Sequence, residues 1–305
     1  RFSVHMMLST GNSLFSFFAV SDLHITQRLR GKTAGKRYKA WRFLENEEYS
    51  FGLVVGDVTN GCGEEEFAIA KTEFTPLIKR VPLLIGYGNH DYFPNHPGDV
   101  AAPESRRQFS DWVTAENKQY GCSLGFFGEI QCFEAWVCGI QVLSLDCAVN
   151  YPAAEAGEAQ LQWLDEKLTQ SDDERFRIVM SHFPLKDYVP GKTGKKQIDY
   201  VRDSVKQQRI LQKHQNILFF SGHTHFSLLS ESPSVLFDES NKVVYCNTAS
   251  VGNTVSVSKT TGGQQGNISG SMGLQVEVYE SGIQVQGIDF LSSSKIEKCC
   301  FTLEM

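Results

Sequence analysis

The sequence predicts a layered α/β fold whose functional site lies at the ends of strands. Apolar runs rich in β-forming residues mostly alternate with stretches of helical periodicity, which is the order typical of sheets covered by helices. Polar residues follow several of these runs directly, and in α/β sheets this end of a strand is where ligand crevices form. The length of 305 residues is compatible with one large domain.

Six buried strands are expected in the first three quarters of the chain. The apolar runs that predict them end in polar or glycine clusters and cover residues 15–20, 51–55, 81–85, 140–145, 176–180 and 217–220. The first run is far shorter than the ~20 residues of a membrane span, and Ser21 and Asp22 follow it at once. We therefore interpret it as a strand, and we expect no membrane span.

Five helices are expected between these strands. Their periodic stretches cover residues 36–49, 64–79, 103–120, 158–169 and 200–213. In the fourth stretch, Leu161, Leu164 and Leu168 recur at helical spacing, while Asp165 and Glu166 take the other side. This pattern predicts a helix that packs on a sheet and exposes one face to solvent.

The C-terminal part is expected to be mainly antiparallel strand, over residues 226–305. Strands are predicted at 235–237, 242–246, 273–279 and 283–290, with hairpin turns at 239–241 and 280–282. Residues 256–270, rich in Ser, Thr, Gly, Gln and Asn, are expected to form a mobile surface loop. We expect one domain over residues 8–305, with a motif-bearing core at 15–225, and we interpret residues 1–7 as a cloning remnant.

The composition is that of a soluble globular protein, with 41% hydrophobic and 21% charged residues. A formal net charge of -6 does not favour nucleic acid as a partner. The 8 cysteines show no paired metal-ligand spacing and no compact disulfide pattern. We interpret most of them as buried side chains in a reducing compartment and expect a cytoplasmic location, with an upstream targeting segment as the open alternative.

Five strand ends carry residue types that bind metals. They are Asp22-Leu23-His24, Gly56-Asp57, Gly88-Asn89-His90-Asp91, Ser181-His182 and Gly222-His223-Thr224-His225. Taken alone, most of these have an ordinary structural explanation as a turn, a helix cap or a buried histidine. Only the last is moderately specific, because histidines two apart after a strand can turn both rings toward one centre.

The combination of the five is more informative than any one of them. Of the 8 histidines in the chain, those inside these motifs are His24, His90, His182, His223 and His225. Chance does not account for this concentration. The chemistry of imidazole with carboxylate or carbonyl oxygen suits Mn, Fe or Zn rather than calcium.

The order and spacing of these motifs, from residue 22 to residue 225, resemble the calcineurin-like metallophosphoesterase superfamily. The resemblance implies a four-layer α/β/β/α sandwich of two mixed β-sheets flanked by helices. It also implies two metal ions that share Asp57. One ion would be held by Asp22, His24, Asp57 and His225, and the other by Asp57, Asn89, His182 and His223.

The same resemblance implies a mechanism. In two-metal sites, with ions ~3.5–4 Å apart, a bridging water is acidified to hydroxide for in-line attack while both ions clamp phosphate oxygens. His90 is assigned to catalysis rather than to metal binding, as a proton donor to the leaving group. Asp91 is expected to orient the ring of His90.

The branch of the superfamily is narrowed by what the motifs lack. The segment after Asp57 has no arginine of the Ser/Thr protein phosphatase type, and Asn60 stands where purple acid phosphatases have a metal-binding tyrosine. Two larger branches are less favoured, because little chain follows residue 225 for the extra domain of 5′-nucleotidases, and the acidic balance suits DNA-repair nucleases poorly. What remains resembles the class III cyclic-nucleotide phosphodiesterase group, through residues 88–91, 182–184, 145–146 and 160–164.

We therefore expect a metal-dependent phosphodiesterase that acts on a small-molecule phosphate ester. A phosphomonoesterase acting on proteins or small molecules stays open, because it would use the same metals. A non-catalytic scaffold of the same fold is the third reading, and it is weakened because every ligand position is filled. The sequence specifies neither the natural substrate nor an oligomeric state.

The walls of the pocket are expected in the loops at residues 27–36, 92–103, 150–156 and 186–196. The basic clusters of residues 28–32 and 186–196 are candidates to bind a substrate anion, with solvated surface charge as the alternative. Tyr92, Phe93 and Tyr188 are candidates to stack on a base, with loop packing as the alternative.

Overall fold

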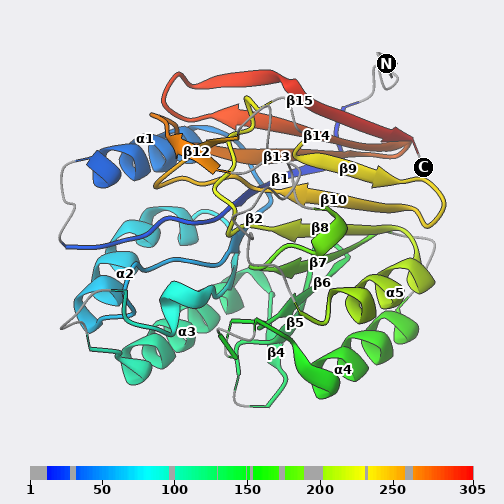
Figure 1. Cartoon of the computed structure of the whole chain (residues 1–305), viewed down its shortest axis with the longest axis horizontal. Coiled ribbons are helices and arrows are strands. Elements are labelled where there is room, and N and C mark those ends of the chain that lie inside the picture. Colours follow the sequence, from blue (N-terminus) through cyan, green and yellow to red (C-terminus); the bar gives the residue numbers. More distant parts are fainter. Residues whose placement is uncertain are drawn as a thin grey trace.

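Two mixed β-sheets pack face to face, and helices cover the outer face of each (Figure 1). This computed structural model describes residues 12–27, 32–95, 100–128, 130–148, 150–151, 154–171, 176–188, 202–230, 233–257 and 264–304. The expected four-layer α/β/β/α sandwich is thereby confirmed. Residues 1–7, 28–31 and 189–201 lie outside the described parts, and with them most of the two basic clusters predicted at 28–32 and 186–196.

The first sheet joins the start of the chain to its end. Its strand order is β15-β14-β13-β1-β2-β3, with β1 (Phe15–Val20), β2 (Phe51–Val55) and β3 (Leu83–Gly86) parallel to one another. The antiparallel strands are β13 (Met272–Tyr279), β14 (Gly282–Asp289) and β15 (Ser294–Glu304). Its outer face carries α1 (Lys32–Asn46), α2 (Glu64–Ile78) and α3 (Pro103–Asn117).

The second sheet has the strand order β4-β5-β6-β7-β8-β10-β9. The parallel strands are β6 (Ile140–Leu145), β7 (Arg177–Ser181), β8 (Ile217–Ser221) and β10 (Val243–Asn247). The antiparallel ones are β4 (Leu124–Phe126), β5 (Phe133–Val137) and β9 (Val235–Asp238). Its outer face carries α4 (Gly157–Gln170) and α5 (Ser204–His214).

Three short 3₁₀ turns and a small hairpin complete the described structure. The turns are η1 (Asn89–Asp91), η2 (Lys118–Tyr120) and η3 (Lys186–Tyr188), and the hairpin pairs β11 (Val255–Val257) with β12 (Gln264–Asn267). The first of the turns, η1, follows β3 and carries one of the five motifs.

Side chains of strand β1 alternate between two hydrophobic cores, one between the sheets and one under the helices. Phe17 and Ala19 point between the sheets, while Phe18 and Val20 point to the helices, because successive side chains of a strand face opposite ways. Phe17 stacks on Phe51 at 4.5 Å and meets Phe220 of the other sheet edge-on at 6.0 Å. The two sheets are therefore joined by close aromatic packing in the core between them.

The expected strands and helices of the first three quarters are all present, with ends shifted by a few residues. The predictions missed β4, β5 and β15. Strand β15 lies at a sheet edge, is more than half exposed, and has charged residues between its apolar ones without strict alternation, so its sequence carries little of the pattern of a buried strand. The predicted loop at 256–270 is wrong in part, because it includes β12 and most of β11. The expectation of antiparallel strands after residue 226 also has an exception, because β10 runs parallel to β8.

The cysteines and the first strand agree with the sequence reading. All eight cysteines are free, and all but Cys138 and Cys300 are buried. Residues 15–20 form the central strand β1. Within the described parts of the chain, no helix is both long and apolar enough to cross a membrane.

Candidate metal centre

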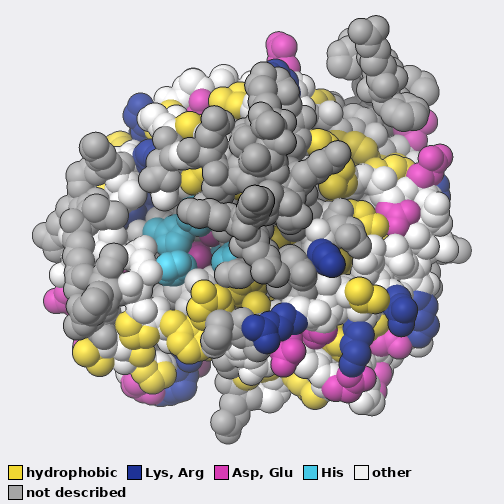
Figure 2. Space-filling model, viewed as in Figure 1, with side chains coloured by type: hydrophobic (Ala, Val, Ile, Leu, Met, Phe, Trp, Pro, Cys, Tyr) yellow, Lys and Arg dark blue, Asp and Glu magenta, His cyan; other side chains and the backbone are white. Residues whose placement is uncertain are grey.

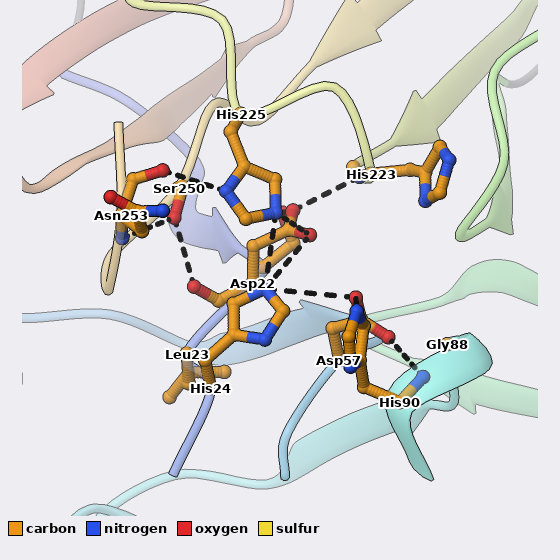
Figure 3. A network of polar contacts seen from close by, with 12 residues as sticks. Asp22, Leu23, His24, Asp57, Gly88, His90, His223, His225, Ser250 and Asn253 are labelled. Carbon is orange, nitrogen blue, oxygen red and sulfur yellow. Dashed lines mark hydrogen bonds and ion pairs between the residues drawn. The ribbon is translucent and has the colours of Figure 1, made fainter. Parts of the chain in front are cut away.

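The parallel strands deliver their following loops to one edge of the sandwich, and the five motifs meet there. Two groups of side chains each place their ligand atoms within 4.8 Å of one another. The first group is Asp22, His24, Asp57 and His225, and the second is Asp57, His182 and His223. In Figure 3, His225, Asp22 and His24 gather around one point, with Asp57 and His90 beside it.

Asp57 belongs to both groups, and its two oxygens have different partners. The Oδ1 atom accepts a hydrogen bond from the backbone N–H of His90 at 2.9 Å. The Oδ2 atom lies 3.2 Å from His182 Nε2 and 3.7 Å from His24 Nε2. Burial disfavours its charge, but His182 and other nearby imidazoles outweigh this and hold the pKa of Asp57 well below its usual range.

Asp22 is held in a similar way. Its Oδ2 atom accepts hydrogen bonds from the Ser21 hydroxyl and, at 3.0 Å, from the backbone N–H of His223. Its Oδ1 atom lies 3.0 Å from His225 Nε2. One oxygen of each aspartate is thus used to fix the side chain, and the other faces the histidines.

Backbone carbonyls orient two of the clustered histidines. His182 Nδ1 lies 2.9 Å from the Val55 carbonyl, and His225 Nδ1 lies 2.6 Å from the carbonyl of Asn253. Because a carbonyl only accepts, these contacts assign the proton to Nδ1 in both rings and leave Nε2 toward the aspartates. Supporting hydrogen bonds of this kind are typical of metal-binding histidines.

The backbone of the centre is strained at the residues that carry the side chains. Positive φ angles occur at Asp22 (54°), His24 (47°), Asp57 (52°), His223 (65°) and His225 (56°). Such a conformation is uncommon for residues other than glycine and concentrates at functional sites. Hydrogen bonds between the loops enforce it, among them Asp22 N–H to the Gly56 carbonyl at 3.0 Å and Leu23 N–H to the Asp57 carbonyl at 2.9 Å.

Several buried polar atoms of the motifs have no hydrogen-bond partner of acceptable geometry among the described residues. They are Asp22 Oδ1, His24 Nδ1, Asn89 Oδ1 and His182 Nε2. Burial first, and then repulsion from neighbouring imidazoles, lowers the pKa of His24 and of His223 to about 3, so both rings are neutral. Unpartnered polar atoms cost ~1–3 kcal/mol each when buried, and neutral imidazoles with carboxylates are ligands that transition metals prefer. The residues present therefore fit a pair of metal ions.

Asn89 lies next to this cluster, since the residue after it donates its N–H to Asp57. Its side chain is buried, and its amide oxygen is one of the unpartnered atoms. These observations agree with the expected ligand position, and its role as a ligand stays a prediction.

The expected role of Asp91 is wrong, because the ring of His90 has another partner. His90 Nδ1 lies 2.9 Å from the carbonyl oxygen of Asn60. The buried Asp91 carboxylate instead accepts hydrogen bonds from the N–H groups of Thr59 and Gly88 at 2.8 and 2.9 Å, and from the Thr59 hydroxyl. It ties the loop after β2 to the loop after β3, and burial, with the nearby Asp57 charge, raises its pKa to about 6.

Glycines in the motifs let these loops approach each other. A Cβ atom at Gly88 would lie 2.1 Å from Asp57 Oδ1, and one at Gly222 would lie 2.5 Å from the Ser21 hydroxyl oxygen. No real Cβ contact is so short, so both positions require glycine.

A pocket of about 1040 Å³ opens at the centre. His24, His90 and His225 line one part of it, and Figure 2 shows histidine side chains beside acidic ones in a hollow of this face. Other lining residues were not singled out from the sequence as substrate contacts, namely Lys39, Asn60, Asn253, Ile268, Ser269 and Leu291. They were missed because they come from a helix face and from loops far along the chain, with no motif to mark them.

The aromatic candidates are divided between packing and the surface. Tyr188 stacks on Tyr245 at 3.5 Å, and Tyr92 donates its hydroxyl to Asp146 and packs against Arg106 at 3.9 Å. For these two the packing alternative holds. Phe93 is 37% exposed and lies beside Tyr151, with ring centroids 5.7 Å apart, so its role in stacking stays a prediction.

Comparison with known proteins assigns the family. The family model of calcineurin-like phosphoesterases matches residues 15–227, so the chain belongs to this family. Among curated proteins, a sequence search finds no match.

Three solved structures illustrate the shared fold. A dimetal phosphatase from Danio rerio has a TM-score of 0.62 at 14% identity, covering 96% of this chain and 99% of its own. A purple acid phosphatase from yellow lupin seeds has a TM-score of 0.63 at 12% identity, covering 96% of this chain and 54% of its own. GAP50, the anchor in the inner membrane complex of Plasmodium, has a TM-score of 0.56 at 13% identity, covering 95% and 88%.

Proposed function

We propose that this protein is a two-metal hydrolase of phosphate esters that acts on diesters. One observation carries the two-metal part of the proposal: Asp57 Oδ2 stands between two groups of ligand side chains, 3.2 Å from His182 Nε2 and 3.7 Å from His24 Nε2. A carboxylate so placed is suited to bridge two cations. When bound, such a pair supplies Lewis acidity that activates water and neutralises phosphate charge.

The proposed ligand sets follow the two groups. Asp22, His24, Asp57 and His225 would hold one ion, and Asp57, Asn89, His182 and His223 the other. The second set takes the amide oxygen of Asn89 as its fourth donor. The nitrogen and oxygen donors favour Mn, Fe or Zn, without selecting one of them.

His90 is proposed as the proton donor to the leaving group. Its Nδ1 contact to the Asn60 carbonyl turns Nε2 toward the centre, where it lies 4.0 Å from Asp57 Oδ2. With Nδ1–H given to a carbonyl, the protonated ring presents Nε2–H to an ester oxygen bound at the centre. His90 also lines the pocket, so a substrate can reach it.

Two observations support an organic phosphate ester as the substrate. The pocket volume of about 1040 Å³ far exceeds that of a phosphate group, so the pocket has room for an organic part. The motifs resemble the phosphodiesterase group, which favours the diester over the monoester. The Danio rerio neighbour has the same fold and is called a phosphatase, so a phosphomonoesterase stays the alternative.

The test is a metal-reconstituted assay of bis-p-nitrophenyl phosphate against p-nitrophenyl phosphate with Mn, Fe, Zn, Co and Ni. The diester should be cleaved at least as fast as the monoester, and a chelator should abolish both activities. A strong monoester preference with every metal would assign the protein to the phosphatases. Bound metal without turnover of either ester would favour a scaffold role, of which the anchor GAP50 is an example on this fold.

A further inference from the structure

Two lysines of helix α1 line the same pocket as the metal centre. The pocket is bounded by His24, His90 and His225 in one part and by Lys36 and Lys39 in another. Residues three apart in a helix lie on the same side, so the two ammonium groups belong to one face of α1. The pocket therefore joins a site for a phosphate to a local concentration of positive charge.

These lysines differ from Arg37 and Arg42 of α1, because they have no carboxylate partner among the described residues. Arg37 donates to both oxygens of Glu73, at 2.8 and 3.0 Å, and Arg42 lies 3.6 Å from Glu45. Among the described residues, Lys36 and Lys39 form no ion pair. Lys39 Nζ donates a hydrogen bond to the carbonyl of Leu291 at the pocket wall, at 3.4 Å.

Arg37, which lies between Lys36 and Lys39 in the sequence, fixes helix α1 relative to the metal centre. Arg37 is buried and also reaches the carbonyl of Leu23, at 3.5 Å, between Asp22 and His24. Trp41 Nε1 donates to the same Glu73 at 3.1 Å. This network holds the lysine face at a set position beside the metal-binding loop.

Partial burial lowers the pKa of Lys36, because it disfavours the charged ammonium group. An anion in the pocket would offset this penalty. The protein as a whole carries a formal charge of -6, so a locally positive pocket wall is a departure from its average. The remaining pocket volume is available for an organic spacer between two anionic groups.

We propose that Lys36 and Lys39 form a subsite for a second phosphate group of the substrate, bound while the first phosphate lies at the metal centre. The inference rests on the proposed function in one respect, namely that the centre binds the first phosphate. It names the substrate class as phosphate esters that carry a further phosphate.

The test uses alkane-1,n-diol bisphosphates with three, four and six carbons, each beside its monophosphate. Binding to the metal-loaded protein is measured by calorimetry and by inhibition of bis-p-nitrophenyl phosphate hydrolysis. Without a subsite, a bisphosphate binds about 2-fold tighter than its monophosphate on statistical grounds alone. With the subsite, at least one spacing should bind ~10-fold tighter, since a charge-assisted contact of ordinary strength gives about this factor.

Substitutions separate the lysines from other charges. Lys36→Gln with Lys39→Gln should bring the ratio of bisphosphate to monophosphate affinity back to about 2, and Lys36→Glu with Lys39→Glu should bring it lower still. Lys71→Gln, on α2 beside Trp112, is the matched control and should leave the ratio unchanged. All variants should retain the metal content and melting temperature of the parent.

The outcomes distinguish this inference from the proposed function. A protein that cleaves no ester, yet binds a bisphosphate with a lysine-dependent preference, would support the subsite and reject the hydrolase. An active hydrolase whose affinity ratio stays near 2 at every spacing would overturn the subsite. A ratio near 10 that survives the double glutamine substitution would overturn it as well.

Discussion

At the scale of single residues, the centre combines strained backbone with unpartnered polar atoms. Asp22, His24 and Asp57 adopt left-handed conformations that cost ~1–3 kcal/mol each for residues other than glycine. Asp22 Oδ1 and His182 Nε2 are buried without a hydrogen bond of good geometry among the described residues. Bound cations would offset these costs, so we expect metal binding and the local conformation to be strongly linked.

The shared carboxylate of Asp57 leads to a first prediction. Asp57→Asn should reduce turnover at saturating metal more than His225→Ala does, and by more than the ~10–100-fold typical of losing a supporting partner. The reason is that Asp57 belongs to both ligand groups, whereas His225 belongs to one. Elemental analysis and steady-state rates measure the effect.

Asp111→Asn, on the exposed surface of α3, is the control for the loss of one negative charge. It should leave metal content and rate unchanged. Near-normal turnover in Asp57→Asn, beside an inactive His225→Ala, would show that the bridging assignment is wrong.

The second prediction concerns His90. His90→Ala should keep both metals and the fold while lowering turnover ~10²–10⁴-fold for esters with poor leaving groups, as expected for loss of a general acid. The loss should shrink for p-nitrophenolate, which departs without a proton. Turnover of an alkyl ester and of a p-nitrophenyl ester by the parent and by His90→Ala measures this difference, and the metal content of both proteins is determined in parallel.

A variant that fails mainly by losing metal would instead mean that His90 is structural. Its backbone N–H already supports Asp57 Oδ1, and a substitution retains that bond. The side chain can therefore be tested apart from the backbone.

At the scale of elements, the site depends on how closely the strand-end loops approach one another. Asp91 bonds to the loops after β2 and β3, and the Gly222 N–H donates to the carbonyl of His182 at 3.0 Å, which joins the loops after β7 and β8. Helix α4 is attached in a similar way, because the Gln160 amide accepts from the N–H of Asp146 and donates to its carbonyl, at 3.0 and 3.1 Å. These two hydrogen bonds give a structural role to residues 145–146 and 160–164, which carry part of the resemblance to the phosphodiesterase group.

Gly88 provides the third prediction. Gly88→Ala should lower metal occupancy and activity sharply, because its Cβ would lie 2.1 Å from Asp57 Oδ1 and 2.6 Å from the Asp57 backbone nitrogen. We expect a loss of stability of ~1–3 kcal/mol as the loops separate. Metal titration and thermal unfolding measure the two effects.

Gly125→Ala is the matched control, since a Cβ in this edge strand would meet nothing closer than 3.9 Å. It should bind metal like the parent. Equal behaviour of the two variants would mean that the close approach of the loops at Gly88 is not required.

At the scale of the whole molecule, the site joins both halves of the sandwich. Asp22 and Asp57 follow strands of the first sheet, while His182, His223 and His225 follow strands of the second. Metal binding should therefore stabilise the contact between the sheets as well as the loops.

The fourth prediction follows from this arrangement. A metal at 100 times its dissociation constant adds ~2.7 kcal/mol to the free energy of unfolding, if it binds only the folded state. For a chain of this size we expect a rise in melting temperature of ~5 °C, which a chelator reverses. Calorimetry with and without metal measures it.

The Asp57→Asn variant should lose most of that rise. A melting temperature that does not respond to any of Mn, Fe, Zn, Co or Ni would contradict a metal centre shared by the two sheets. Retention of the full rise in the variant would remove Asp57 from the site.

The sequence by itself determined the family, the order of the main strands and helices, and the residues that meet at the centre. It could do so because buried parallel strands are nearly continuous apolar runs, and because ligands placed directly after them must share one edge of a sheet. Strand β15 was not predicted, because this edge strand shows no strict alternation of apolar and polar residues and is stabilised by pairing with β14.

Only the tertiary structure decided what surrounds the ligands. In the folded chain, the ring of His90 contacts the carbonyl of Asn60 rather than Asp91. The ring of His225 contacts the carbonyl of Asn253, which is distant in the sequence. The fold also brought Lys39 of α1, which lies beyond the predicted wall segment 27–36, into the pocket with His225. Such contacts depend on packing between distant segments and leave no local pattern, so no spacing along the chain predicts them.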